Sequence, residues 1–407
     1  MVIGAGAVVF LTASPIFYGF GTIFNEIVEE MAWSVGTVSL AFSLRTEVGG
    51  LASPLVGVLL DRQGPKQVVR FGVVITASGV LALSFISTLW HFYAAMLLIA
   101  VGNSALGGQP GNYAAATWFQ QKRSKAMAVM TLGGGLGGVT VIGMAWLVET
   151  YGWRPTLQFI AAFIVVAGLP VGSVVRRRPV DHPQPMDGVA PSVADGQVRD
   201  TRPPEERGTP FRDAIRDPGL WRFFAAVVAL DFGFVSVVVH QVPFLETTLG
   251  TSKAVAGASV TVFALASIVG RLGIGWIGDT YPKRVVLTAA MALMASGLPV
   301  LYLATETWHV FVAILLIAPG FGGSIPLRPA YMADVYGVKA FGKLIGIMRL
   351  TATTGGASGA WLVGALFDRT GEYKPGWLVV SIVTALAVPL MWGVRPRAAD
   401  KTVVEAG

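Results

Sequence analysis

The 407-residue chain has no cysteine, only four histidines and few charged residues. Without cysteine it has no disulfides or thiolate metal sites, and the histidines are too scattered to form a ligand cluster, so we expect no metal and no cofactor. Charged residues make up 13% of the sequence and hydrophobic residues 54%, with a mean hydropathy of +0.65. This composition excludes an ordinary water-soluble fold, and no motif supports an enzyme.

Long apolar segments recur along the chain. A transmembrane helix needs about 20 apolar residues, and these runs are too long for barrel strands and lack their alternation. We therefore predict an all-α integral membrane protein with twelve transmembrane helices. The predicted spans are residues 3–25, 37–60, 68–88, 92–118, 125–149, 155–175, 219–245, 254–278, 284–304, 309–335, 340–367 and 376–395.

The two halves of the sequence repeat one another at an offset of 218 residues, without a gap between Trp33/Thr251 and Tyr113/Tyr331. Self-similarity of this length in an apolar chain is typical of parallel repeats in secondary transporters. We predict two six-helix bundles over 1–175 and 219–395, followed by a cytoplasmic tail over 396–407. The matched positions are Asp61 with Asp279, Trp90-His91 with Trp308-His309, and Tyr113 with Tyr331.

Residues 176–218 interrupt the membrane pattern. They hold eight prolines, mixed charges and few large apolar residues, a composition that cannot bury a core. We predict a disordered cytoplasmic linker, with a regulatory segment as the alternative. Residues 211–217 are expected to form a short amphipathic helix at the membrane surface.

Lysine and arginine indicate the orientation. Loops on the side of the termini carry 21 of them, whereas the opposite loops carry only Arg154, Lys253, Arg369 and Lys374. By the positive-inside rule both termini are cytoplasmic, and the net charge of +7 then reflects topology and anionic lipid, so we expect no nucleic-acid partner. The first span is too long for a signal peptide and no basic residue precedes it. Met1 begins directly in this apolar run, so one expectation is that a short leader is missing.

The repeated loop carries a family resemblance. Gly57-Val-Leu-Leu-Asp61-Arg62-Gln-Gly64-Pro-Lys66 resembles the signature between the second and third helices of the major facilitator superfamily, and Gly275 to Arg284 resembles its second copy. The resemblance covers essentially the whole chain. It implies gating roles for Asp61, Arg62 and Asp279. The Asp61 side chain is then expected to contact the N-terminus of the helix over 340–367, where a carboxylate is favoured. The alternative is that Asp61 only caps a turn and Arg62 binds lipid phosphate.

A narrower resemblance indicates one branch of that superfamily. Trp118-Phe119-Gln-Gln-Lys122-Arg123-Ser-Lys125-Ala126, followed by Gly133 to Gly138, is similar to a signature of monocarboxylate transporters and their oxalate:formate exchanger relatives. His240-Gln-Val-Pro-Phe244 and Val269-Gly-Arg271-Leu-Gly also resemble that branch, which implies that Arg271 is the substrate arginine. The aspartate that animal members carry four positions before this arginine is Ser267 here.

Seven charged residues lie within the predicted spans, where a charge is costly and normally faces a cavity or a partner. Arginines outnumber acids among them, and an unneutralised guanidinium suits a carboxylate substrate through two parallel hydrogen bonds. The seven are Arg45, Glu47, Asp231, Arg271, Arg328, Asp334 and Arg349. Asp334 lies near the cytoplasmic end, and Arg45 is predicted to be structural.

The other arginines have separate interpretations. Arg271 is predicted to anchor the anion rather than to form a structural ion pair. For Arg349, a second anion contact and an ion pair with Glu47 are about equally favoured. Arg328 either lines the cavity or pairs with Asp334, and we favour the pair.

Proton coupling needs a group that changes charge near the working pH. Asp231, subject both to desolvation and to a nearby arginine, is the predicted switch; a permanently ionised partner of an arginine is an equally favoured alternative. Glu47 is the next candidate. His240, nearer the external end, could assist proton access or only anchor its helix at the interface.

Polar aromatic and amide residues complete the predicted cavity. Tyr113 and Tyr331 match in the repeat, and a phenol offers one hydrogen bond and an apolar wall to a short carboxylate. Tyr18, Gln109 and Asn112 are the other candidates, with interfacial or packing roles as the alternative. The glycines at 133–138 and 355–359 are predicted to allow close helix contact and rocking.

These features predict a secondary transporter that moves a small organic anion, a monocarboxylate such as lactate or pyruvate, by alternating access and proton symport. We expect it to act as a monomer in the plasma (inner) membrane. Anion exchange of the oxalate:formate type is the alternative. A non-transporting receptor is a different class, which would need a folded cytoplasmic domain that the linker and tail are too short and polar to provide.

Overall fold

The computed structural model describes residues 1–13, 20–176 and 208–394. Tyr18, residues 177–207 of the predicted linker and the tail over 396–407 lie outside these residues. The chain divides into two compact units. The first unit comprises Met1–Lys122, Val129–Gly208 and Val338–Ile347, and the second comprises Arg123–Ala128, Thr209–Gly337 and Met348–Gly407.

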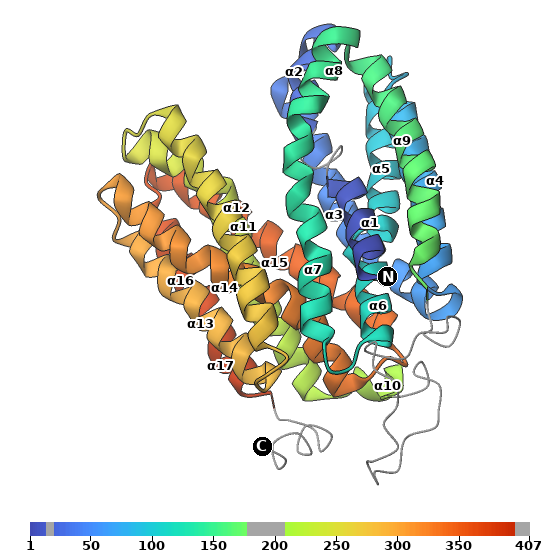
Figure 1. The fold of residues 1–407 in the computed structure, drawn as a ribbon. Helices are drawn as coiled ribbons and strands as arrows, with labels where there is room; N and C mark the ends of the chain where they lie inside the picture. Colours follow the sequence, from blue (N-terminus) through green and yellow to red (C-terminus); the bar gives the residue numbers. More distant parts are fainter. Residues whose placement is uncertain (14–19, 177–207, 395–407) are drawn as a thin grey trace. The chain divides into compact units, whose positions relative to one another are not determined.

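The first unit is built from the helices of the first half of the sequence (Figure 1). The start of one of them, α7, clusters with the second unit instead. The helices are α1 (Val2–Thr12), α2 (Phe20–Met31), α3 (Val35–Gln63), α4 (Pro65–Leu83), α5 (Leu89–Leu106), α6 (Gly108–Trp118), α7 (Arg123–Leu136), the 3-10 turn η2 (Gly137–Thr140), α8 (Val141–Tyr151) and α9 (Trp153–Val174).

Polar caps and glycine turns set the ends of these helices. Ser34 accepts a hydrogen bond from the N–H of Thr37 at the start of α3, which satisfies an amide that has no partner inside the helix. Gly64 joins α3 to α4 at φ 79°, a left-handed conformation that favours glycine. Pro65 then suits the first turn of α4, where no N–H is needed.

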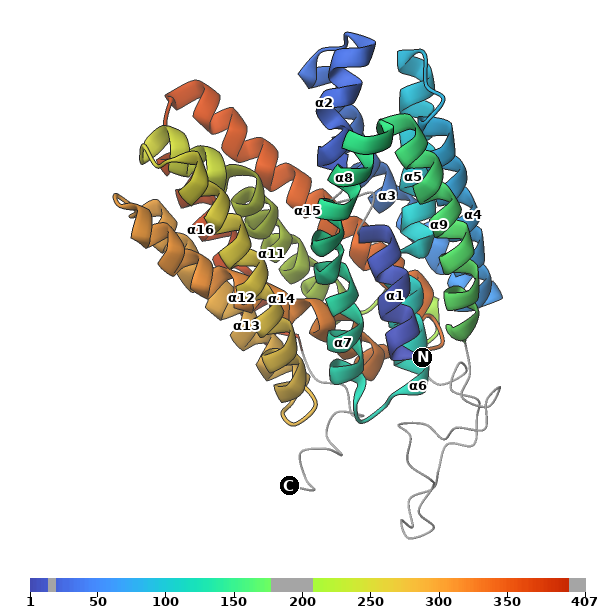
Figure 2. The same ribbon diagram turned by 45° about the horizontal axis from the view of Figure 1, so that its top comes forward.

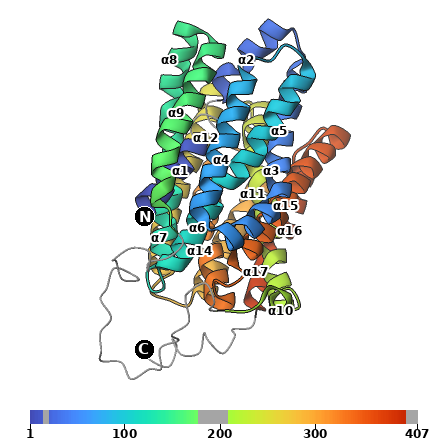
Figure 3. The same ribbon diagram turned by 90° about the vertical axis from the view of Figure 1, so that its right-hand side faces the viewer.

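Helix α4 packs against both α5 and α9 (Figure 3). Glycine allows the close approach, because a Cβ on Gly102 of α5 would lie 2.3 Å from Thr76 Oγ1. Buried apolar side chains such as Val73 and Ile99 belong to the core of this unit.

The predicted span over 92–118 is broken in the middle. Helix α5 ends at Leu106 and α6 begins at Gly108, while Gly107 is extended at φ −61° and ψ −167°. The Gly107 N–H donates to the carbonyl of Asn103 at 2.8 Å. Broken membrane helices present backbone polar groups within the bilayer, commonly where a cavity or binding site is lined.

The second unit is built from the helices of the second half of the sequence. The short helix expected over 211–217 is present as the four residues of α10. The helices are α10 (Phe211–Ala214), α11 (Pro218–Pro243), the π-helical turn η6 (Phe244–Thr248), α12 (Lys253–Ile277), α13 (Lys283–Tyr302), α14 (Thr307–Tyr336), α15 (Phe341–Thr370), α16 (Lys374–Ala385) and α17 (Ala387–Trp392).

Helix α14 packs against both α12 and α13 (Figure 2). The contact with α12 depends on glycine from both sides. A Cβ on Gly322 of α14 would lie 2.2 Å from the carbonyl of Ser267, and one on Gly270 of α12 would lie 2.2 Å from the carbonyl of Pro319. The backbones of α12 and α14 therefore touch directly, one residue before Arg271.

The predicted glycine contacts are present inside each unit. In the first unit, a Cβ on Gly133 of α7 would lie 2.0 Å from the carbonyl of Gly6 on α1. In the second, a Cβ on Gly359 of α15 would lie 2.3 Å from the carbonyl of Phe232 on α11. The prediction of close helix contact at both glycine clusters is confirmed.

The repeated Trp–His pairs begin equivalent helices. His91 Nδ1 lies 3.2 Å from Ser87 Oγ at the start of α5, and His309 Nδ1 accepts the N–H of Glu306 at 3.1 Å at the start of α14. Both imidazoles thus bond to groups that precede their helix. This part of the repeat is a helix-start signal.

Eight helices of the described residues are long and apolar enough to cross a membrane. Two other predicted spans correspond to α3 and α15, which have 29 and 30 residues but carry more polar side chains. The remaining two contain the shorter helices α1 and α2, and α7 and α8. The predicted all-helical membrane architecture is confirmed.

Candidate functional site

Asp61 lies in the last turns of α3 and caps the start of α15. Its carboxylate accepts hydrogen bonds from the N–H groups of Gly342 at 2.8 Å and Lys343 at 3.1 Å. Glycine is required at the crossing, because a Cβ on Gly342 would lie 2.4 Å from the carbonyl of Gly57. The negative charge offsets the positive end of the helix dipole, so the contact implied for Asp61 is confirmed. Arg62 follows it on the exposed side of α3.

Asp279 makes the matching contact. It accepts hydrogen bonds from the N–H groups of Ser124 at 2.8 Å and Lys125 at 2.9 Å, at the start of α7. All three positions lie 218 residues from their counterparts around Asp61. We call the contact of Asp61 with Gly342 and Lys343 the Asp61 clasp, and that of Asp279 with Ser124 and Lys125 the Asp279 clasp. These contacts explain why residues 123–128 and 338–347 cluster with the other half of the sequence.

Basic residues surround Asp334 beside the Asp279 clasp. Lys283 Nζ lies 2.7 Å from Asp334 and 3.9 Å from Asp279, and Arg123 also pairs with Asp334. The prediction that Arg328 pairs with Asp334 is therefore wrong. The two residues are six positions apart on α14, so they lie about 9 Å apart along the axis and project from different faces.

Arg328 pairs instead with Asp231 of α11. Its Nη1 lies 2.5 Å from Asp231 Oδ2, and its Nη2 donates to Ser324 Oγ at 2.9 Å. Asp231 is 9% exposed and Arg328 is 6% exposed. The Arg328 Cζ also lies 5.2 Å from the ring centre of Phe321. Burial of both partners makes the loss of either one costly.

Arg349 brings a second positive charge towards Asp231. It precedes Gly356 by two turns of α15, and a Cβ on Gly356 would lie 3.6 Å from the carbonyl of Asp231. The Arg349 side chain is exposed, yet its charge is near enough to attract the Asp231 carboxylate. Asp231, Arg328 and Arg349 form what we call the Asp231 cluster, with one carboxylate and two guanidiniums.

Two further predicted residues belong to the second unit. Arg271 is half-buried on α12, directly after the tight contact of Gly270 with α14. Tyr331 is buried on α14, with its ring centre 5.5 Å from that of Phe223 on α11. The second unit therefore holds three of the four intramembrane arginines together with one of the matched tyrosines.

The first unit places the predicted amides after the break in α5–α6. Gln109 is 1% exposed, and neither its amide oxygen nor its nitrogen has a hydrogen-bond partner among the described residues. Asn112 Oδ1 likewise has no hydrogen-bond partner among the described residues. The Asn112 Nδ2 lies near the first turn of α6, 3.8 Å from where a Cβ on Gly108 would be. Tyr113 is buried against Phe341, with ring centres 6.2 Å apart.

The remaining candidates have different surroundings. His240 Nε2 lies 2.9 Å from the carbonyl of Ala360, and its ring centre is 5.7 Å from that of Tyr373. Glu47 is half-buried on α3. Arg45 is buried on the same helix, beside a small cavity of about 10 Å³ with mostly apolar walls. The structure thus pairs Asp231 with Arg328, and it places His240 of α11 against the backbone of α15.

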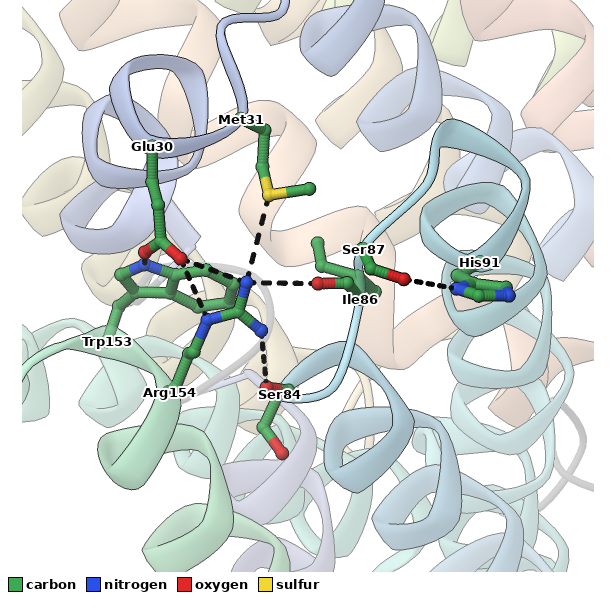
Figure 4. Close-up of polar contacts among 8 residues, drawn as sticks. All are labelled: Glu30, Met31, Ser84, Ile86, Ser87, His91, Trp153 and Arg154. Carbon is green, nitrogen blue, oxygen red and sulfur yellow. Dashed lines mark hydrogen bonds and ion pairs between the residues drawn. The ribbon is translucent and has the colours of Figure 1, made fainter.

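One network was missed at the sequence level (Figure 4). Arg154 of α9 donates to Glu30 at 3.0 Å and to the carbonyls of Ser84 at 2.8 Å and Ile86 at 3.0 Å. Trp153 Nε1 donates to the same Glu30 carboxylate at 2.6 Å. This Arg154 network ties the end of α2 to the α4–α5 loop and to α9. Its only sequence signal is an arginine in the loops that carry few basic residues.

No group of three or more His, Asp or Glu side chains that could hold a metal ion occurs within 1–13, 20–176 and 208–394. The Asp231 cluster offers positive charge for an anion and a carboxylate for a proton.

Comparison with known proteins gives a family match over nearly all of the chain. A family model described as Major Facilitator Superfamily matches residues 6–243 and 227–407. Monocarboxylate transporter 13 of Bos taurus is 27% identical over 387 residues, which cover 92% of this chain and 86% of that protein. The oxalate:formate antiporter of Oxalobacter formigenes is 22% identical over 387 residues, which cover 94% and 88% of the two chains.

Solved structures agree in fold. The human organic anion transporter MFSD10 (TETRAN) has a TM-score of 0.73 at 14% identity, covering 96% of this chain and 98% of that one. The Escherichia coli fucose:proton symporter has a TM-score of 0.71 at 13% identity, covering 97% and 98%. Both share the all-helical architecture described above.

Proposed function

We propose, from the premise that this chain belongs to the major facilitator superfamily, that it moves a small organic anion by alternating access and proton symport. The chain is a multi-pass membrane transporter and not an enzyme. The proposed substrate is a monocarboxylate such as lactate or pyruvate. We further propose that it works as a monomer in the plasma (inner) membrane with both termini in the cytoplasm, in line with the excess of basic residues on that side.

The Asp231 cluster is the observation that carries the proposal. Arg328 of α14 pairs with Asp231 of α11 inside the second unit, and the charge of Arg349 also attracts that carboxylate. Both α11 and α14 are long and apolar enough to cross a membrane. A surplus positive charge at this depth is costly unless a ligand or partner neutralises it. A carboxylate substrate fits that requirement, and relatives named as monocarboxylate transporters support the choice.

Arg271 and Arg349 are the proposed anion contacts. Arg271 is supported by the signature that it shares with the monocarboxylate branch, and Arg349 by its exposure beside Asp231. Tyr331 would close the wall of this site in the second unit. In the first unit the buried amides of Gln109 and Asn112 would contribute hydrogen bonds, together with Tyr113; Tyr18 is proposed on the sequence alone.

Asp231 is the proposed proton carrier. Its ion pair with Arg328 favours the ionised form, while burial opposes it, so a change in the surroundings of Asp231 can move its proton on or off. Glu47 and His240 are proposed as secondary sites along the proton path. Asp61, Arg62 and Asp279 are proposed to gate the cytoplasmic side by holding and releasing the starts of α15 and α7.

Uptake of labelled lactate by purified protein in proteoliposomes tests the proposal. We expect accumulation when the outside is acidified and little when the pH is equal on both sides, with empty liposomes as the control. Exchange that proceeds at full rate without a pH gradient, together with a preference for dicarboxylates, would instead support antiport, which the oxalate:formate antiporter relative favours. No transport of any short carboxylate under either condition would reject the proposed substrate class.

A further inference from the structure

The Asp231 cluster holds one more positive charge than negative charge. Asp231 contributes one carboxylate, whereas Arg328 and Arg349 contribute one guanidinium each. Guanidinium groups stay protonated in proteins, so the excess is permanent while Asp231 is ionised. The charge of the cluster is balanced only when a further negative group joins it.

The two arginines differ in how firmly they are held. Arg328 is buried and makes three contacts, with the Asp231 carboxylate, the Ser324 hydroxyl and the ring of Phe321. Phe321 is itself fixed by stacking on Phe234, with ring centres 3.4 Å apart. The Arg349 side chain is exposed, so a substrate can reach it more readily than it can reach Arg328.

We infer that Arg328 is a positioning residue that occupies the Asp231 carboxylate and thereby leaves Arg349 available for the carboxylate of the substrate. The inference depends on the proposed function, in which the substrate is a carboxylate and Asp231 carries the proton. When a proton from water binds a carboxylate oxygen of Asp231, the cluster gains one positive charge and attracts the anion more strongly. Proton and anion then favour each other's binding, which is the coupling that symport needs.

Charged groups act on Asp231 from two of the helices around α11. Arg328 comes from α14 and Arg349 from α15. Helix α16 presents the neutral Thr384 hydroxyl, which would lie 2.2 Å from a Cβ on Gly233. Because guanidinium groups stay protonated in proteins, a pH effect in this cluster is assigned to Asp231.

Exchange of labelled lactate in proteoliposomes tests the inference with two double variants of equal charge. Asp231→Asn/Arg328→Gln and Asp231→Asn/Arg349→Gln each leave one guanidinium and no carboxylate. We expect the first to exchange lactate at a rate that changes little between acidic and alkaline pH, because no carboxylate competes with the substrate for Arg349. We expect the second to exchange at least about tenfold more slowly than the first, because the remaining Arg328 is held away from the substrate.

The single variant Arg328→Gln separates positioning from a merely structural role. With Arg328 gone, ionised Asp231 captures Arg349, so we expect exchange to fall about tenfold at alkaline pH and to recover at acidic pH. A structural defect would reduce exchange at both pH values. If this variant does not fold, the comparison of the two double variants still tests the inference.

Two results would overturn the inference. One is equal exchange by the two double variants, and the other is a loss in folded Arg328→Gln that acidic pH does not relieve. If the wild-type protein exchanges lactate and the two double variants behave alike, the inference is rejected and the proposed function stands. A wild-type protein that exchanges no lactate rejects the proposed function and the inference with it.

Discussion

Asp61 and Asp279 occupy equivalent places in the sequence repeat, and each carboxylate accepts two backbone hydrogen bonds at the start of a helix that the other half of the sequence supplies. Each carboxylate is therefore held both by hydrogen bonds from the first N–H groups of the helix and by attraction to the positive end of the helix dipole. The same chemistry, repeated at an offset of 218 residues, gives the protein two matched clasps.

Removing the charge of Asp61 should loosen the start of α15. We expect Asp61→Asn to weaken the clasp by about 1 kcal/mol, because an amide keeps one acceptor but loses the charge–dipole attraction. The chain has no cysteine, so Ala340→Cys would be a unique reporter; Ala340 is 3% exposed. Its labelling by a maleimide should rise severalfold in Asp61→Asn.

Asp213 provides the control for that labelling experiment, because it is an exposed carboxylate on α10. Asp213→Asn should leave the labelling of Ala340→Cys unchanged. If Asp61→Asn and Asp213→Asn label at the same rate, Asp61 does not hold this segment closed.

Arg271 is predicted to be indispensable for uptake. We expect Arg271→Ala to reduce lactate uptake about a hundredfold, because a planar guanidinium can bind a carboxylate through two hydrogen bonds. Arg271→Lys should recover part of the loss, since it restores charge without the paired geometry. Initial rates of labelled lactate uptake measure both effects.

Arg222 is the matched control for this prediction. It is exposed at the start of α11 and donates to the carbonyl of Gly393 at 3.1 Å. Arg222→Ala should transport at nearly the wild-type rate. Normal uptake by correctly folded Arg271→Ala would remove Arg271 from the substrate site.

Gly359 should tolerate no side chain. A Cβ there would lie 2.3 Å from the carbonyl of Phe232, so Gly359→Ala must push α15 away from α11, at a cost of about 1–3 kcal/mol. Gly364 on the same helix is the control, because its nearest atom, His240 Cε1, would be 3.7 Å away. We expect a lower melting temperature in detergent for Gly359→Ala and no change for Gly364→Ala; equal melting of both would contradict tight packing at this point.

Arg154 should stabilise the first unit without affecting substrate choice. Its guanidinium satisfies the carbonyls of Ser84 and Ile86 and the Glu30 carboxylate, although the pair with Glu30 is partly exposed. We expect Arg154→Ala to cost about 1–2 kcal/mol, mainly through the orphaned carbonyls. Arg369 is an exposed arginine at the end of α15, and Arg369→Ala should not change the melting temperature. An equal effect of the two substitutions would show that the network adds no stability.

The sequence predicts the fold because every relevant signal is local or repeated. Length and apolarity predict the helices, and the repeated Asp61 and Asp279 motif predicts where each clasp acts. Partner choice in the membrane is not local. Arg328 could reach an acid on its own helix or one on a neighbour, and only the packing of α14 against α11 decides for Asp231 over Asp334. The break at Gly107 is equally hidden, because glycine is tolerated in intact membrane helices.

Gln109 offers a direct test of whether the amides of α6 serve recognition. A buried amide without partners costs about 1–3 kcal/mol, and both polar atoms of Gln109 lack partners among the described residues. If Gln109 only fills space, Gln109→Leu should leave both stability and transport unchanged or improved. We expect instead that Gln109→Leu keeps or raises the melting temperature while KM for lactate rises about fivefold or more, because a substrate hydrogen bond is lost. A higher melting temperature with unchanged KM would assign Gln109 to packing and leave the anion site to the arginines of the second unit.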